Sequence, residues 1–372
     1  MGILVGFPRT EGSEKDCQLN TGKADEQRME VRKPFFPAEW YPQSGVQLTW
    51  PHAETDWAYM LEEVQNCFVD IAREIAEREL LLIVTPEPEE VKRQIAATVN
   101  MENVRFLKCK TNDTWARDHG AITMMDADGP SLLDFTFNGW GLKFASHLDN
   151  QITRHAVENG ILNGRYVNRL GFVLEGGSIE SDGMGTLLTT SECLLSPNRN
   201  GQKNKAEIEE YLKSTFQLQQ ILWLDNGYLA GDDTDSHVDT LARLCPDNTI
   251  VYVQCNDETD EHYEALRAME EQLHSFRTLN GEPYRLLPLP MADKVMEEEE
   301  RLPATYANFL ILNGAILYPT YSQPENDGRA REVLQEAFPG YQIVGIDCRA
   351  LIKQHGSLHC VTMQYPLGVL KQ

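Results

Sequence analysis

The stretch LEGGSIESDGMGTLLTT at 174–190 contains two short apolar segments, 177–180 and 185–189, which are joined by a turn that contains Asp and Gly. This arrangement is typical of a β-hairpin. A helical pattern at 204–216 and an apolar strand at 221–224 follow it. The order strand, strand, helix, strand is therefore the unit from which we predict the fold.

The same order recurs along the chain. Further pairs of apolar segments are joined by short turns, and amphipathic helical patterns separate them from single strands. The expected hairpins are 121–125 with 132–136, 238–244 with 250–254, and 306–311 with 315–318; the expected helices are 55–79, 88–98, 260–276 and 329–338; and the strands that follow these helices are 80–84, 104–107, 284–288 and 342–346.

Polar landmarks stand near the start of successive units. They are Asp118, Glu175, His237 and Asn308, at intervals of 57, 62 and 71 residues. A period of this size indicates a radial or stacked repeat. No G-x-G-x-x-G motif follows a strand and no P-loop is present, so a nucleotide-binding sheet is not expected. We predict an α/β protein built as a closed ring of ββαβ modules.

Length and composition fit one large domain. The chain has 372 residues, of which 41% are apolar, enough for a sizeable core. After a short apolar start, residues 1–32 are polar and charged; we expect a loosely ordered extension there and a single domain at 33–372. No run of eighteen apolar residues exists and no charged region precedes the apolar start, so neither a membrane span nor a secretory signal is expected.

The net charge is −24, from 33 basic and 57 acidic residues. This balance argues against nucleic acid or an anionic membrane as a partner and is compatible with a cationic small molecule, although most of these carboxylates are expected only to face solvent. The eight cysteines form no C-x-x-C pair. We therefore expect reduced thiols, a cytoplasmic location and no zinc ribbon.

Four segments at 111–120, 174–183, 231–240 and 355–362 are dense in polar, Gly and aromatic residues. Each precedes or begins an expected strand. In a ring of modules, equivalent strand ends meet at the axis, so residues far apart in sequence can face one pocket.

Cys360 begins an expected apolar strand, where a cysteine is most often a packed core residue. The nearby Gly356 favours a second interpretation, because it lets a substrate approach the backbone. A nucleophilic thiol also needs a base. The adjacent His359 would point to the opposite face of a strand, whereas His355 in the preceding loop and His237 could both reach the thiol.

His237 lies in an acidic segment that permits two interpretations. One is a divalent metal site, because Asp232, Asp233, Asp235 and Asp239 are close in sequence. No second histidine stands at ligand spacing, which weakens this interpretation. On a strand, His237 and Asp239 would share a face, as a base and a substrate-binding carboxylate would require.

The remaining candidates have ordinary alternatives. Asp118 could form a surface pair with Arg117, and Glu175 could be a turn residue. Trp115 suggests a pocket instead, because an indole face attracts a flat cation by about 0.5–2 kcal/mol. Trp140 offers a second ring, although buried tryptophans are usually core residues.

Several motifs together resemble the agmatine deiminase family, which is related to the bacterial peptidylarginine deiminases. The resemblance runs from about residue 37 to 366 and depends on the order and spacing of all motifs. These motifs are PAEWYPQ at 37–43, LTWPH at 48–52, WARDHG at 115–120, EGGSIESDGMGTLLTT at 175–190, LSPNRN at 195–200, GDDTDSHVD at 231–239 and GSLHC at 356–360.

The resemblance implies a five-bladed α/β-propeller, the pentein fold, with pseudo-five-fold symmetry. It places the catalytic cysteine on Cys360, the histidine on His237, the guanidinium-binding carboxylates on Asp118 and Asp239, and the active-site glutamate on Glu175. In that site Glu175 would orient His237. Substrate-binding positions are expected at Trp115, Trp140, Asp233 and Gly356.

Two departures from the family pattern affect the far end of the substrate. Ala121 follows Gly120 where the family commonly has Pro, and the acidic segment GDDTDSH is shorter than usual. The chemistry is therefore predicted more securely than the identity of the substrate's tail.

The implied reaction is hydrolysis of agmatine to N-carbamoylputrescine and ammonia through a covalent thiouronium on Cys360, with no metal and no organic cofactor. The resemblance also suggests a homodimer or larger homo-oligomer. Three alternatives stay open: a deiminase of free or peptidyl arginine, a metal-dependent hydrolase built around His237, and a catalytically silent polyamine-binding module.

Overall fold

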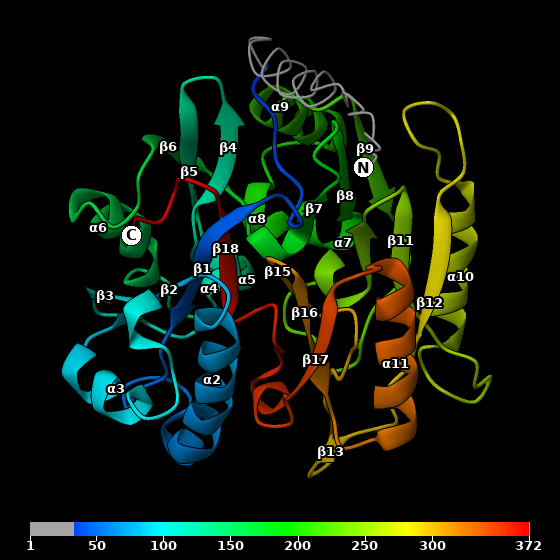
Figure 1. Cartoon of the computed structure of the whole chain (residues 1–372). Helices are drawn as coiled ribbons and strands as arrows, with labels where there is room; N and C mark the ends of the chain where they lie inside the picture. Colours follow the sequence, from blue (N-terminus) through cyan, green and yellow to red (C-terminus); the bar gives the residue numbers. More distant parts are fainter. Residues whose placement is uncertain (1–32, 372) are drawn as a thin grey trace, which may run out of the picture. The chain divides into compact units, whose positions relative to one another are not determined.

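The computed structural model describes residues 33–371. The extension expected at 1–32 lies outside the described residues. From Pro34 to the end of the described chain, the protein forms one compact unit. It is a mixed α/β structure in which most strands belong to small sheets of three or four strands (Figure 1).

The unit with which the sequence analysis began is confirmed. Strand β7 (Ile179–Ser181) pairs antiparallel with β8 (Thr186–Thr190), and β8 pairs parallel with β9 (Gln220–Leu224). Helix α9 (Lys205–Phe216) connects the two parallel strands. It begins at a capping box formed by Asn204 and Glu207, which satisfies backbone N–H groups of the first turn.

Three further sheets have the same pairing, an antiparallel hairpin followed by a parallel strand. They are β4 (Ile122–Asp126), β5 (Gly129–Thr136) and β6 (Arg165–Val173); β10 (Ala242–Cys245), β11 (Thr249–Gln254) and β12 (Arg285–Pro290); and β15 (Leu310–Leu312), β16 (Ala315–Thr320) and β17 (Gln342–Asp347).

The two ends of the described chain build the remaining large sheet. Strand β1 (Gln43–Thr49) pairs antiparallel with β18 (Thr362–Pro366) and parallel with β2 (Leu80–Thr85), which pairs with β3 (Val104–Lys108). The sequence analysis expected β2 and β3 but no strand at 43–49. The order β18-β1-β2-β3 therefore repeats the pattern of the other sheets with strands from opposite ends of the chain.

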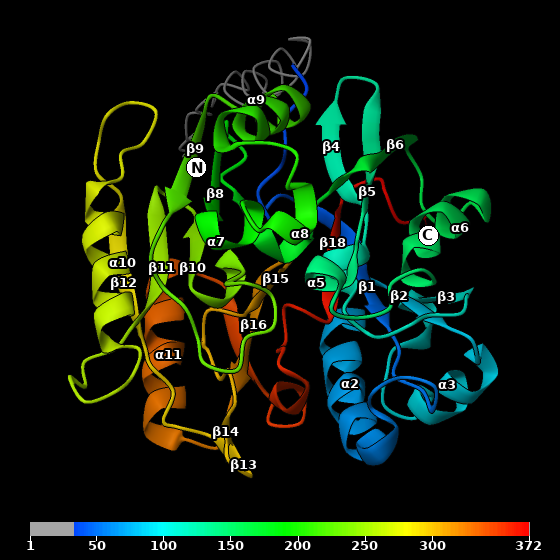
Figure 2. The same cartoon turned by 180° about the vertical axis from the view of Figure 1, so that it is seen from behind.

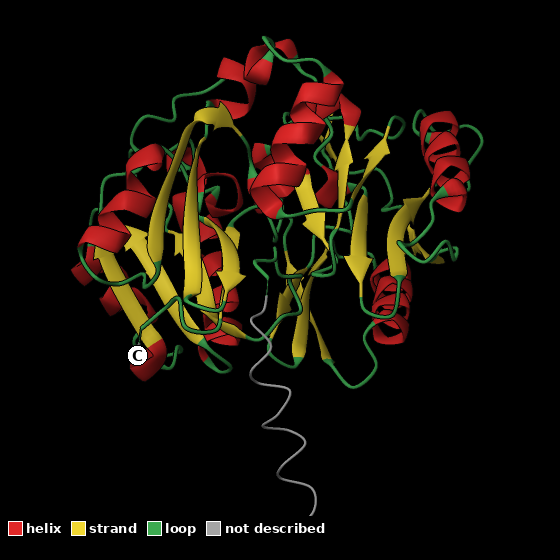
Figure 3. Ribbon diagram, turned by 90° about the horizontal axis from the view of Figure 1, so that it is seen from above, coloured by secondary structure: helices red, strands yellow, loops and turns green. Residues whose placement is uncertain are grey.

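Amphipathic helices cover these sheets, and Figures 2 and 3 show helices mainly toward the periphery with strands between them. In α2 (Leu61–Ala76) the buried side chains recur at helical spacing, as expected. No helix between residues 33 and 371 has the length and apolar character that a membrane span needs. The other long helices are α3 (Pro88–Ile95), α10 (Tyr263–Ser275) and α11 (Pro324–Ala337).

The prediction of a strand at 238–244 is wrong for the first half of this range. Residues Val238–Thr240 form a single 3₁₀ turn, and β10 begins only at Ala242. The Thr240 hydroxyl donates to the carbonyl of His237 (2.8 Å) and the Leu241 N–H donates to the carbonyl of Val238 (3.0 Å). These bonds close a turn, so a strand's alternation of faces does not apply to His237.

A fully buried guanidinium joins three of the sheets. Arg243 on β10 donates to Glu180 on β7, to Glu39 before β1 (2.8 Å), and to the carbonyl of Phe309 before β15. Its side chain has no exposed surface. A buried charge of this kind is tolerated only when it is paired and hydrogen-bonded, so Arg243 fixes the relative positions of these segments.

We expect Arg243→Ala to lower the free energy of unfolding by about 3–5 kcal/mol, because buried Glu180 would lose its cation and buried Glu39 would lose one of its charged partners. The matched control is Arg73→Ala, which breaks an exposed pair with Asp70 and should cost less than about 1 kcal/mol. Denaturant unfolding measures both values. Equal losses in the two variants would contradict the central role of Arg243.

Candidate active site

A small cavity of about 40 Å³ opens beside Cys360. Its inner wall is buried, and its outer wall is partly exposed. The wall brings together six of the residues proposed from the sequence: Trp115, Asp118, Trp140, Asp233, Gly356 and Cys360. It also contains Asp56, Asp113, Phe144, Thr234, Gln354 and His355.

Cys360 lies in a turn two residues before β18, not at the head of the strand as expected. The carboxamide oxygen of Asn308 accepts bonds from the Cys360 thiol (3.4 Å) and from the N–H groups of Cys360 (3.3 Å) and His359 (2.9 Å). Asn308 was the fourth landmark of the repeat. It therefore fixes the turn that presents the thiol.

Gly177 marks the point where three charged or titratable side chains meet. A Cβ atom at this position would lie 2.6 Å from His237 Nδ1, 3.0 Å from Asp118 Oδ1 and 3.2 Å from Asp239 Oδ2. Only a glycine leaves room for this approach. Two of the polar landmarks, Asp118 and His237, thus meet beside a backbone without a side chain.

Asp118 is held rigidly. Its Oδ2 accepts from the Trp140 indole N–H (3.0 Å), and its Oδ1 accepts from the Gly177 N–H (3.1 Å). Burial and the neighbouring charge of Asp239 raise the pKa of Asp118 well above its ordinary value. A cation placed between these carboxylates would relieve that repulsion.

Asp239 has one satisfied oxygen and one free oxygen. Its Oδ2 accepts from Nδ1 of His359 (2.7 Å), while the buried Oδ1 has no hydrogen-bond partner among the described residues. Burial alone would raise the pKa of Asp239, but the hydrogen bond and charge of His359 hold it below the ordinary value. Asp239 is therefore an ionised carboxylate with one oxygen available for a ligand.

His237 is buried, and neither ring nitrogen has a hydrogen-bond partner within residues 33–371. Its Nδ1 lies 3.7 Å from Asp118 Oδ1. Burial lowers the pKa of His237 to about 3, against the opposing charge of Asp239. The imidazole is therefore neutral in the free protein and able to accept a proton.

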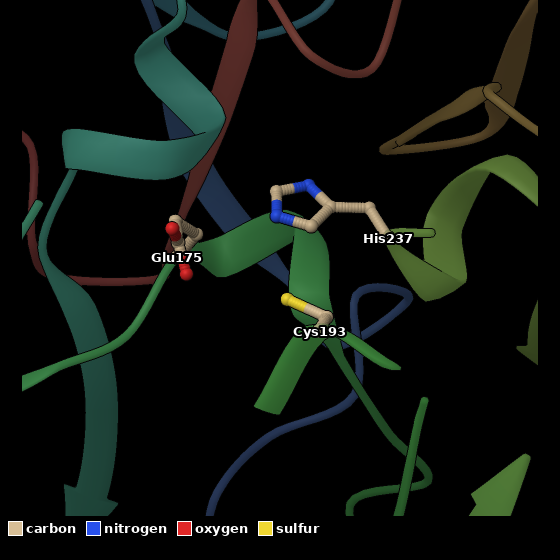
Figure 4. A group of neighbouring side chains, drawn as sticks. All are labelled: Glu175, Cys193 and His237. Atoms are coloured by element: carbon tan, nitrogen blue, oxygen red, sulfur yellow. The ribbon is translucent and has the colours of Figure 1, made fainter. Parts of the chain in front are cut away.

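Glu175 does not hydrogen-bond to His237 as the sequence interpretation required. Both of its oxygens accept from Nε of Arg199 (2.9 and 3.0 Å), so the guanidinium occupies them. Figure 4 shows Glu175, Cys193 and His237 turned toward one another. A carboxylate oxygen of Glu175, the Cys193 sulfur and a ring nitrogen of His237 all lie within 4.8 Å of one another. Glu175 thus lies close to His237 without touching it.

The acidic segment does not gather around His237 as a metal site would require. Asp232 accepts from the N–H groups of Thr234 and Ser236, and Asp235 pairs with Arg199 and Lys143. These carboxylates shape the loop and neutralise cations, so the acidic segment itself does not form the metal site that the sequence allowed. Glu175, Cys193 and His237 have ligand-type atoms close together, but Arg199 occupies both oxygens of Glu175.

Several residues that complete the site have no role predicted from the sequence. Arg199 lies in the LSPNRN motif and Cys193 in the preceding helix α7 (Ser191–Leu194); neither has a signal in the hydrophobic pattern. His359 was set aside as facing away from Cys360. Its ring instead bridges Asp239 and Glu39.

The chain matches known proteins over most of its length. Residues 35–366 match the family model of the Porphyromonas-type peptidyl-arginine deiminases. The chain belongs to this family.

Three relatives illustrate the range of the family. A Porphyromonas gingivalis structure provisionally described as an arginine deiminase is 52% identical, with a TM-score of 0.86 over 91% of this chain and 100% of the other. A Cys-to-Ser agmatine deiminase of C. jejuni with substrate bound is 40% identical, with a TM-score of 0.84 over 91% and 98%. A Vibrio parahaemolyticus protein provisionally described as an agmatine deiminase is 35% identical over 89% and 96%.

The Cys360 thiol should be protonated in the free protein. Burial and the charges of Asp239 and Asp118 raise its pKa well above 9.0, and a group below its pKa keeps its proton. We therefore expect no thiolate absorbance difference between the wild type and Cys360→Ser up to about pH 9. A difference that appears near neutral pH would contradict this electrostatic account.

Proposed function

We propose that this protein hydrolyses the guanidinium group of agmatine, giving N-carbamoylputrescine and ammonia. The observation that supports this proposal is the pair of buried carboxylates, Asp118 and Asp239, whose charges act on buried Cys360, at an acidic cavity that Asp118 and Cys360 line. A planar cation that can donate hydrogen bonds in two directions suits this arrangement.

The substrate's guanidinium would take the place that the two carboxylates leave open. Oδ1 of Asp239 needs a donor, and Asp118 is fixed by Trp140 and Gly177. Trp115 packs closely against Gly356, since a Cβ at 356 would lie 2.1 Å from the indole. This packing forms one wall of the cavity, against which the flat group can lie.

Bound substrate would also create the nucleophile. In the free protein the two carboxylates oppose thiolate formation, whereas a guanidinium between them replaces that repulsion by attraction. The thiol proton then passes to neutral His237, and the thiolate attacks the central guanidinium carbon. His237 returns the proton to the departing nitrogen, and ammonia leaves.

The remaining thiouronium is a cation covalently bound through the Cys360 sulfur. A water that enters after ammonia attacks the same carbon while His237 accepts its proton. The C–S bond then breaks, which releases the ureido product and regenerates the thiol. Glu175, which lies near His237, would stabilise the imidazolium that forms in each half-reaction.

The outer wall of the cavity favours a cationic tail. Asp56, Asp113 and Asp233 are on this wall, and no Lys or Arg of the described chain lines the cavity. Burial and the neighbouring Asp56 raise the pKa of Asp113 to about 7. An ammonium group bound there would favour the ionised carboxylate, whereas the α-carboxylate of arginine would meet only like charge.

A second candidate is the deimination of free arginine, because a relative at 52% identity is provisionally described as an arginine deiminase. The same nucleophile and carboxylates would serve both reactions, so the tail of the substrate discriminates between them. The acidic outer wall favours agmatine.

We expect kcat/KM for agmatine to exceed that for arginine or for arginyl peptides by about a hundredfold or more, since juxtaposed like charges cost several kcal/mol. Ammonia release and a ureido colour assay measure all three substrates. Higher activity on arginine or on peptides would assign the protein to the second candidate function or to its peptide-directed form.

The covalent step is tested by mass spectrometry after brief mixing with agmatine. We expect an adduct on the peptide that contains Cys360, and a loss of activity of about 10⁴-fold or more in Cys360→Ser. Cys255→Ser is the control, because Cys255 is buried outside this cavity and its loss should leave the rate near that of the wild type. Normal turnover by Cys360→Ser would exclude the mechanism.

We also propose that residues 33–372 form one catalytic domain in which the five larger sheets close into a five-bladed propeller. The pairing of β1 with β18 supports this closure, because it completes the fifth sheet from the two chain ends. The cytoplasmic location and the homo-oligomeric state stay predictions.

A further inference from the structure

A chain of buried charges runs from the cavity into the interior. Asp239 accepts from Nδ1 of His359 (2.7 Å), and Nε2 of the same ring lies 2.7 Å from Glu39 Oε2. All three side chains are at least nine-tenths buried. Arg243 continues the chain by donating to the same oxygen of Glu39 (2.8 Å).

His359 is held through its backbone N–H and through both ring nitrogens. Its N–H donates to Asn308 (2.9 Å), and its partner Glu39 is fixed by the Ile311 N–H (2.8 Å) as well as by Arg243. An ionised carboxylate can only accept a hydrogen bond, so Nδ1 of His359 donates to Asp239, while Nε2 lies 2.7 Å from Glu39 and 3.3 Å from the Arg243 guanidinium. The ring therefore links Asp239 to a rigid part of the fold.

We propose that His359 is a positioning residue: held by Glu39, its ring fixes the carboxylate of Asp239 so that Oδ1 faces the guanidinium. This inference rests on the proposed function. Its physical basis is that a carboxylate with one anchored oxygen can rotate little, which keeps the free oxygen aligned for a directional bond. The plain alternative is a packed core histidine whose only effect is on stability.

Two substitutions at the same site separate these roles. The Nδ2 of an asparagine can replace Nδ1 of His359 and still donate to Asp239, but it does not reach Glu39. The Nε2 of a glutamine can replace Nε2 of His359 and reach Glu39, but it leaves Asp239 without a donor. The two variants remove one half of the bridge each and both remove the ring.

We expect His359→Gln to lower kcat/KM for agmatine by about a hundredfold, mainly through a higher KM, whereas His359→Asn should stay within about tenfold of the wild type. Thermal unfolding measured beside the kinetics should show similar losses of stability in both variants. Equal kinetic losses in the two variants, or a larger loss in His359→Asn, would overturn the proposal.

The pH profile provides a readout that a purely structural role would not move. His359 holds the pKa of Asp239 low, so the acidic limb of kcat/KM should shift to higher pH in His359→Gln and less in His359→Asn. An unshifted limb in His359→Gln would overturn the proposal. The other charged or titratable groups that face Asp239, which are unchanged in both variants, are His237, Arg243, Asp118, Cys360 and Arg117.

If neither variant folds, Glu39→Gln tests the same positioning role of His359. Glu39 contacts Nε2 of His359 and does not line the cavity. We expect a KM for agmatine raised by about tenfold, and an unchanged KM would overturn the proposal. The wild type separates the two levels of inference: no turnover of agmatine refutes the proposed function, whereas normal turnover with unaffected variants refutes only the role of His359.

Discussion

Carboxylates that are buried close together repel one another and lose their hydration, so each needs a donor or a cation. The centre of this protein contains several: Glu39, Asp118, Glu175, Glu180 and Asp239 are all buried. The arrangement of the surrounding side chains follows from this constraint. It determines which acids are neutralised within the fold and which can bind a ligand.

Two arginines and one histidine bind most of these carboxylates. Arg199 takes both oxygens of Glu175, and Arg243 lies between Glu39 and Glu180. His359 neutralises one side of Asp239. Among the described residues, the free oxygen of Asp239 and the neighbouring Asp118 have no such cation. The site is therefore short of one positive charge, which is the property that a guanidinium substrate would supply.

The same imbalance explains how the thiol can be inert without substrate. With His237 neutral and two carboxylates nearby, the protonated form of Cys360 is favoured. In the proposed mechanism, the missing cation is the substrate itself. Coupling nucleophile formation to binding would then protect a buried cysteine from other electrophiles, because the thiolate would form only when the guanidinium is in place.

The sequence by itself determined the repeating unit, because the periods of helix and strand are local properties of the chain. It also placed Asp118, Glu175, His237 and Asn308 near the start of successive units. The tertiary structure decided the contacts between them. Pairing of β1 with β18 depends on segments more than 300 residues apart, and no local pattern reports it.

The partners of the charged side chains were likewise decided only by the fold. Glu175 pairs with Arg199 and not with His237, and His359 meets Asp239 because residues 238–240 turn and Cys360 precedes its strand. A strand's alternation of faces had set His359 aside as a partner of Cys360, and the contact with Asp239 was not predicted. Residue identity thus fixed which chemical groups were available, whereas long-range packing fixed which of them meet, because burial and pairing depend on neighbours distant in the chain.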